Sequence, residues 1–91
     1  MLSTVAVMED DRAPIPTDGP ELVYKVVADR IERRIRAGEW GEAGRLPSEN
    51  ELAAWYGVAR MTVRRAHEEL TERGLVTVVP GKGTFIKPRA D

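Results

Sequence analysis

Cysteine is absent from this sequence of 91 residues, so neither a disulfide nor a thiolate metal site can stabilise the fold. A chain of this length makes one small domain, near the lower end of what apolar packing can stabilise without dimerisation. It has one histidine and scattered acids, which supply no nucleophile–base pair, carboxylate pair or metal cluster of the kind that catalysis needs. These shortages exclude an enzyme, and they point to no cofactor and no metal.

Long hydrophobic runs are missing as well. The apolar stretch at residues 2–8 is too short for a membrane span, and it has no basic leader of the kind that starts a secretory signal. The lack of cysteine agrees with a reducing compartment. We therefore expect a cytoplasmic protein without a membrane partner.

An excess of positive charge is also missing, since the net charge is −1. The charge is unevenly distributed, however. Residues 1–22 hold five acids against one arginine, a net charge of −4, which leaves +3 for residues 23–91. Because local charge decides the affinity for phosphate, this second part of the chain remains suited to a nucleic acid.

The sequence divides into one domain with a tail at each end. Residues 1–20 contain three prolines, an acidic run and no helical period, so we expect a disordered, solvated tail. An acidic arm of this kind could instead compete with DNA for the basic surface of its own domain. Residues 21–87 form the domain, and residues 88–91 are a C-terminal tail.

Residues 21–37 show the apolar period of a helix that buries one face, with Gly38 as its cap. A glycine-punctuated loop follows, in which Trp40 is expected to close one edge of the core. Leu46 then begins a very short extended piece. The apolar positions of the helix are Leu22, Val26, Val27, Ile31 and Ile35.

The stretch at residues 48–65 organises the rest of the chain. Ser48 and Glu51 have the spacing of a capping box, which starts a helix over about 49–56. Gly57 ends that helix, because glycine readily adopts the left-handed backbone conformation. A second helix follows over about 60–73. Two short helices joined by a tight turn, the second one basic, predict a helix-turn-helix. The inward positions of the second helix are Val63, Ala66 and Leu70.

A β-hairpin is predicted directly after these helices. Residues 75–79 are rich in β-branched side chains and residues 84–86 suit a second short strand, with a Pro-Gly-Lys-Gly turn between them. A hairpin in this position makes a wing. The predicted fold class is therefore mainly α with a small β-hairpin, a winged helix-turn-helix of three helices and a two-stranded wing.

In this order the motifs resemble the DNA-binding domain of the GntR family of bacterial transcription regulators. The resemblance covers roughly residues 24–86, nearly all of the expected ordered chain. It is carried by Arg-Leu-Pro-Ser-Glu at 45–49, by Val-Ala-Arg-Met-Thr-Val-Arg-Arg-Ala at 58–66 and by Gly-Lys-Gly-Thr at 81–84.

The resemblance implies a sequence-specific DNA-binding transcriptional regulator. The helix at about 60–73 would read double-stranded DNA in the major groove, and the wing at 75–86 would lie at the minor groove. A homodimer on an inverted repeat is implied, whereas repressor and activator are not distinguished. The positions that match DNA-contacting residues of the family are Arg45, Ser48, Asn50, Arg60, Met61, Thr62, Arg64, Gly81 and Lys82.

Two features depart from the pattern of the family. Its members usually carry a second, C-terminal domain that binds an effector and dimerises, whereas this sequence ends just after the wing, so the effector ligand is unknown. Ala59 stands where the family often has a small hydroxyl residue. Without that hydroxyl, the second helix of the motif lacks a cap that is typically worth ~1 kcal/mol.

Simpler interpretations stay open at this stage. The domain could be a winged-helix module that binds protein and not DNA, although the arginines of its second helix count against this. Arg60 and Arg64 could form an ordinary solvated face, and Asn50 and Lys82 could simply be exposed.

Three other side chains could serve the fold instead of contacting DNA. Arg65 is placed for an ion pair with Glu68 or Glu69 as well as for a phosphate contact. Tyr24 is expected to pack in the core in preference to approaching a phosphate. His67 is expected at the edge of the core, and not as a ligand or a pH switch.

Overall fold

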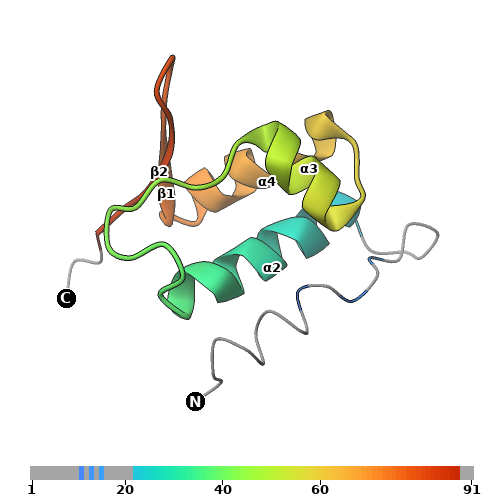
Figure 1. Ribbon diagram of the computed structural model, residues 1–91, viewed down its shortest axis with the longest axis horizontal. Coiled ribbons are helices and arrows are strands. Elements are labelled where there is room, and N and C mark those ends of the chain that lie inside the picture. Colours follow the sequence, from blue (N-terminus) through green and yellow to red (C-terminus); the bar gives the residue numbers. More distant parts are fainter. Residues whose placement is uncertain (1–10, 12, 14, 16–21, 89–91) are drawn as a thin grey trace.

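The computed structural model describes residues 11, 13, 15 and 22–88. Three helices, α2 (Val23–Arg36), α3 (Glu49–Tyr56) and α4 (Arg60–Glu72), precede an antiparallel hairpin of β1 (Val76–Val79) and β2 (Gly83–Ile86). Figure 1 shows α2 and α4 next to each other, α3 across them, and the hairpin projecting from one end of the helical layer. The predicted winged helix-turn-helix is confirmed.

One apolar core joins all five elements. On α4, Val63, Ala66 and Leu70 are fully buried as predicted. On α2, Val27 and Ile31 are buried as predicted, but the expected burial of Leu22 is wrong, because Leu22 precedes the helix and is 54% exposed. Trp40 packs against the edge of this cluster, which confirms its expected place. The remaining buried apolar residues are Ala28, Leu46, Leu52, Tyr56, Val76 and Ile86.

The turn between α3 and α4 follows from its local chemistry. The backbone N–H of Glu51 donates to Ser48 Oγ at 3.1 Å, and the backbone N–H of Ser48 donates to Glu51 Oε2 at 3.1 Å, so the predicted capping box is present. Gly57 ends α3 in the left-handed conformation, at φ +66°. Ala59 precedes α4 with no side-chain cap, as its missing hydroxyl predicts.

A third extended segment fixes the wing to the helices. Within the hairpin, Val76 pairs with Ile86 and Val79 with Gly83. The backbone N–H of Leu46 donates to the carbonyl of Thr84 at 2.9 Å. Arg45 pairs with Phe85, so the expected extended piece begins one residue before Leu46. The loop before α3 is therefore paired with β2 and places the wing beside the start of α3.

The element boundaries differ from the predictions by one or two residues, because end turns depend on local backbone geometry. The first helix covers 23–36 where 21–37 was predicted, and α4 ends at Glu72 where 73 was predicted. The strands cover 76–79 and 83–86 where 75–79 and 84–86 were predicted.

Most of the predicted tails lies outside the described residues. Asp11 is the exception that matters, because it was expected in a solvated segment and is only 3% exposed. None of the helices in the described part of the chain has the length and apolarity that a membrane crossing requires.

Candidate nucleic-acid interface

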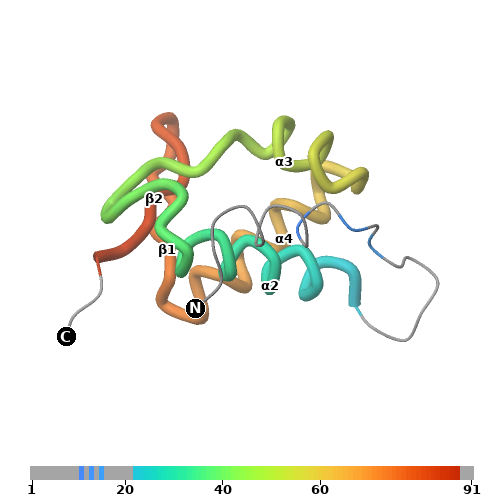
Figure 2. The backbone as a smooth tube through the Cα atoms, turned by 60° about the horizontal axis from the view of Figure 1, so that its bottom comes forward, coloured from blue at the N-terminus to red at the C-terminus, as the bar shows by residue number. Residues whose placement is uncertain are grey.

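A hollow of about 410 Å³ lies between the start of α3, the start of α4 and the wing. The three segments meet there because the loop before α3 pairs with β2, and because the turn after α3 brings α4 back beside it. Figure 2 shows the hairpin and α3 on the same side of the α2–α4 layer. Six of the nine predicted contact residues line this hollow, namely Arg45, Ser48, Asn50, Arg60, Gly81 and Lys82.

Two arginines on one face of α4 share a single acidic partner. Arg60 Nε donates to Glu49 Oε1 at 3.1 Å, and Arg64 Nη2 donates to the same oxygen at 3.2 Å. Both side chains remain about half exposed, at 58% and 47%. The hydrogen bond from Arg64, aided by that from Arg60, lowers the pKa of Glu49 although partial burial opposes the shift. Glu49 therefore stays ionised and holds both guanidinium groups side by side at the surface.

The sequence interpretation missed Glu49 as part of this face. Glu49 lies in the first turn of a capped helix, where acids are favourable because of the helix dipole. This position explains the residue without any contact to α4. The only sequence signal for its second role was its place between Ser48 and Asn50, two predicted contact residues.

Met61, Thr62 and Arg64 do not line the hollow and occupy the adjoining surface of α4. Met61 is 59% exposed, which is unusual for a large apolar side chain, and Thr62 is half-buried. The structure thus brings six of the nine predicted residues together at the hollow, and the other three lie elsewhere on the first turns of α4.

The wing requires a glycine where it passes Arg45. Gly83 has φ +128°, and a Cβ at this position would lie 2.9 Å from Arg45 Nε. Arg45 therefore lies directly against the wing backbone. Gly81, at φ +77° in the turn, has open space around it, which suits close approach of a partner to the backbone.

His67 joins α4 to the wing beneath this face. Its side chain is buried, with Nδ1 at 3.4 Å from Thr84 Oγ1, and Nε2 is buried without a hydrogen-bond partner in the described structure. Burial lowers the pKa of His67, opposed only by the charge of Glu49. The expectation of a histidine at the core is confirmed.

Tyr24 and Arg65 contact each other, which neither structural alternative anticipated. The guanidinium carbon of Arg65 lies 4.4 Å from the centroid of the Tyr24 ring, a cation–π contact between α2 and α4. Tyr24 is half-buried and lies outside the apolar core, so its expected core packing is wrong. The pair needs two helices that are adjacent in space but far apart in sequence, so local spacing could not reveal it.

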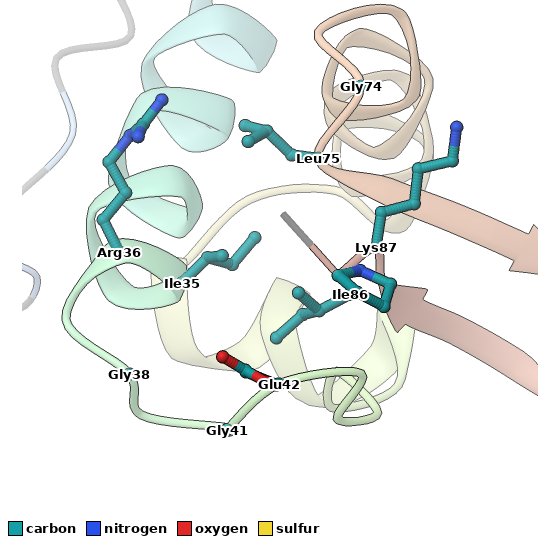
Figure 3. Close-up of a pocket in the computed structure, with 10 residues that line it drawn as sticks. Ile35, Arg36, Gly38, Gly41, Glu42, Gly74, Leu75, Ile86 and Lys87 are labelled. Atoms are coloured by element: carbon teal, nitrogen blue, oxygen red, sulfur yellow. The ribbon is translucent and has the colours of Figure 1, made fainter. Parts of the chain in front are cut away.

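A second hollow, of about 840 Å³, lies where the chain leaves the wing. Figure 3 shows the side chains of Ile35, Leu75 and Ile86 around this space. They come from the end of α2, the segment between α4 and β1, and the end of β2. It shares no lining residue with the first hollow. Within the described part of the chain, no group of three or more potential ligands could hold a metal ion.

The capped helix, the tight turn, the arginine-bearing helix and the anchored hairpin together define a winged helix-turn-helix domain. The chain belongs to the family described as bacterial regulatory proteins, gntR family, which it matches over residues 23–86. The predicted family is confirmed, and it is a family of regulatory proteins and not of enzymes.

Relatives and solved structures agree with this assignment. The histidine utilization repressor of Klebsiella aerogenes is 42% identical over 71 residues, which are 78% of this chain and 30% of that protein. YtrA from Sulfolobus acidocaldarius, a GntR-family transcription factor, has a TM-score of 0.72 and 32% identity, over 87% of this chain and 83% of that chain. AraR(DBD) in complex with operator ORE1 has a TM-score of 0.70 and 34% identity, over 80% and 89%. The chain spans about 30% of the length of the curated relatives it matches.

Proposed function

We propose that this chain is a sequence-specific DNA-binding domain of a transcriptional regulator. The observation that carries the proposal is the joint placement of Arg60 and Arg64 on α4, held by Glu49 beside the hollow that the wing closes. The operator complex of AraR(DBD), whose fold and sequence are similar, supports this proposal. A regulator of this kind acts in the cytoplasm, where bacterial DNA lies.

The first turn of α4 would enter the major groove. Side chains at the start of a recognition helix face base edges, and an arginine can donate two hydrogen bonds to O6 and N7 of guanine. Arg60 and Arg64 are half exposed and lie on one helical face, so both can reach base edges. Thr62 can donate to a phosphate, and the apolar Met61 can contact a thymine methyl group.

The remaining predicted residues would position the domain on the backbone and in the minor groove. Ser48 and Asn50 at the start of α3 offer polar side chains, and the N-terminus of that helix favours an adjacent phosphate. Gly81 and Lys82 at the wing tip combine close backbone approach with a positive charge, which suits the minor groove. Arg45 lies between these two parts.

We further propose that two copies bind an inverted repeat. A two-fold symmetric site presents two equivalent half-sites about one helical turn apart, which two identical domains can read together. Sedimentation of the protein with a selected operator duplex should give two protein chains for each duplex.

Fluorescence anisotropy with duplex DNA at several salt concentrations tests the proposal. Because Arg64 would contact DNA, Arg64→Ala should weaken binding about tenfold and reduce the salt dependence. Arg36→Ala is the matched control, since the Arg36 side chain is 48% exposed and also pairs with a glutamate, Glu32, but lies at the far end of α2. It should leave affinity nearly unchanged.

Two results would contradict the proposal. Equal losses of DNA affinity in Arg64→Ala and Arg36→Ala would show that any positive charge contributes. The α4 face would then have no specific role in binding. Absence of binding by the folded wild-type chain at low salt would instead favour a module that binds protein.

A further inference from the structure

The carboxylate of Asp11 occupies a site made by three donors from α2 and α3. Trp55 Nε1 donates to Oδ2 at 2.7 Å, and the Tyr56 hydroxyl donates to Oδ1 at 2.7 Å. Arg34 Nη1 lies 3.1 Å from Oδ2. These are short, charge-assisted contacts to an anion that is nearly removed from water.

The donors are held in place by groups that do not belong to the N-terminal arm. Arg34 is 5% exposed, and its Nε and Nη2 donate to the two oxygens of Glu39, each at 2.7 Å. Its guanidinium carbon lies 4.6 Å from the centroid of the Trp40 ring and 5.2 Å from that of Trp55. The site is therefore built by the domain itself, and it presents donors to whatever anion enters.

The titration behaviour of the site agrees with this geometry. Burial alone would lower the pKa of Arg34, but hydrogen bonds to Glu39 and Tyr56, with the charge of Asp11, hold it above its ordinary value. Burial, together with Asp11, raises the pKa of Tyr56, although Arg34 opposes the shift. Both groups therefore remain protonated donors throughout the physiological pH range.

The backbone of the same segment is also bound. Arg30 Nη1 donates to the carbonyl of Asp11 at 3.2 Å and to the carbonyl of Ala13. Ile15 packs against the core cluster. Hydrogen bonds to the side chain of Asp11, hydrogen bonds to the backbone and apolar packing of Ile15 thus hold this segment. The sequence pattern had predicted a solvated tail there.

We propose that Arg34, Trp55 and Tyr56 form a carboxylate-binding site whose ligand is Asp11 of the same chain. Asp11 then acts as a latch that links α2 to the last turn of α3. None of these four residues lines the hollow between the wing and α4, so the site is separate from the proposed DNA face. It does constrain the end of α3, which leads through Gly57 into α4.

The substitution Asp11→Asn would test the proposal in the full chain. Asp11→Asn removes the charge and turns one acceptor oxygen into a donor, which conflicts with the donors around it. Asp10→Asn is the control, because it removes the same charge from the same arm. We expect Asp11→Asn to lower the melting temperature by roughly 5–10 °C, and Asp10→Asn to lower it far less.

The indole N–H resonance of Trp55 gives a local readout. The chain has two tryptophans, so Trp55→Phe assigns the two indole signals in a ¹⁵N–¹H spectrum. The Trp55 signal should shift in Asp11→Asn and stay in place in Asp10→Asn. In Asp11→Ala, added acetate should return part of the lost melting temperature, whereas an equal concentration of chloride should not.

Three outcomes would overturn the proposal. One is an unchanged Trp55 signal in Asp11→Asn with a stability loss equal to that of Asp10→Asn. Another is strict additivity of Asp11→Asn and Tyr56→Phe in a double-mutant cycle, which would show no coupling between the pair. The third is a Trp55 signal that depends on protein concentration, which would place the arm of a second copy in the site.

Discussion

Glu49 and Arg64 join the start of α3 to α4 through two hydrogen bonds. Arg64 Nε donates to Glu49 Oε2 at 3.3 Å and Nη2 donates to Oε1 at 3.2 Å. We expect the glutamate to have opposing effects on DNA binding. It orients the guanidinium before DNA arrives, and it also places a negative charge beside the groups that would meet phosphate.

Replacing Glu49 should separate these two effects. In Glu49→Gln the negative charge is lost, so affinity for random-sequence DNA should rise several-fold at low salt. Because Arg60 and Arg64 are then less well oriented, the ratio of operator to random affinity should fall. Anisotropy titrations with both duplexes measure the two quantities. Glu72→Gln, an exposed acid at the end of α4, is the control. A higher operator-to-random ratio in Glu49→Gln would contradict the orienting role.

The stability of the domain should decrease below neutral pH because of His67. Its pKa in the folded state lies below the ordinary value of 6.5, whereas the unfolded chain takes up the proton near that value. The unfolded state then binds more protons, so the free energy of unfolding falls as pH drops below 6.5. The slope is at most about 1.4 kcal/mol per pH unit.

Urea denaturation at pH 7.5 and 5.5 measures this effect. The decrease between the two pH values should shrink in His67→Leu, which cannot titrate. An identical pH dependence in wild type and variant would assign the change to other groups.

A serine at position 59 should stabilise the domain. Ala59 has the extended backbone of an N-cap and no side-chain acceptor for the first amides of α4. The hydroxyl in Ala59→Ser would accept one of them and add ~1 kcal/mol, which is roughly 4–8 °C in melting temperature. Ala54→Ser, at an exposed position within α3, should be slightly destabilising. A gain in both variants would point to a cause other than capping.

Alanine at position 83 should damage the wing more than alanine at position 81. Both glycines have positive φ, and φ +128° at Gly83 lies farther outside the region that an alanine can adopt than φ +77° at Gly81. Only at Gly83 would the added Cβ also meet Arg45, at 2.9 Å from Nε. Thermal denaturation should therefore show a larger loss for Gly83→Ala. Equal losses would mean that the Arg45 side chain moves aside at no cost.

Local chemistry made most of the fold predictable from sequence. The capping box of Ser48 and Glu51, the left-handed Gly57 and the glycine-rich turn of the wing each act within a few residues, so their patterns are visible in the chain. Six of the nine predicted contact residues come from these same segments and line one hollow.

The missed features all depend on contacts between distant segments. Asp11 meets Tyr56 across 45 positions, and nothing in an acidic, proline-containing stretch indicates such a partner. The bridge from Glu49 to Arg60 and Arg64 requires the exact approach of α3 to α4. Side-chain geometry of this kind is decided by packing, and not by period or composition.

The pairing of Arg45 with Phe85 has a consequence for the order in which the domain forms. These residues are about 40 positions apart, so their contact carries a larger loop-closure cost than any contact within a helix. The helices can form early from local interactions, whereas the pairing of Arg45 with Phe85 can form only after β2 is present. During synthesis, the surface between the wing and α4 is thus completed after the helices, and a nascent chain that lacks β2 has its helices before it can bind an operator.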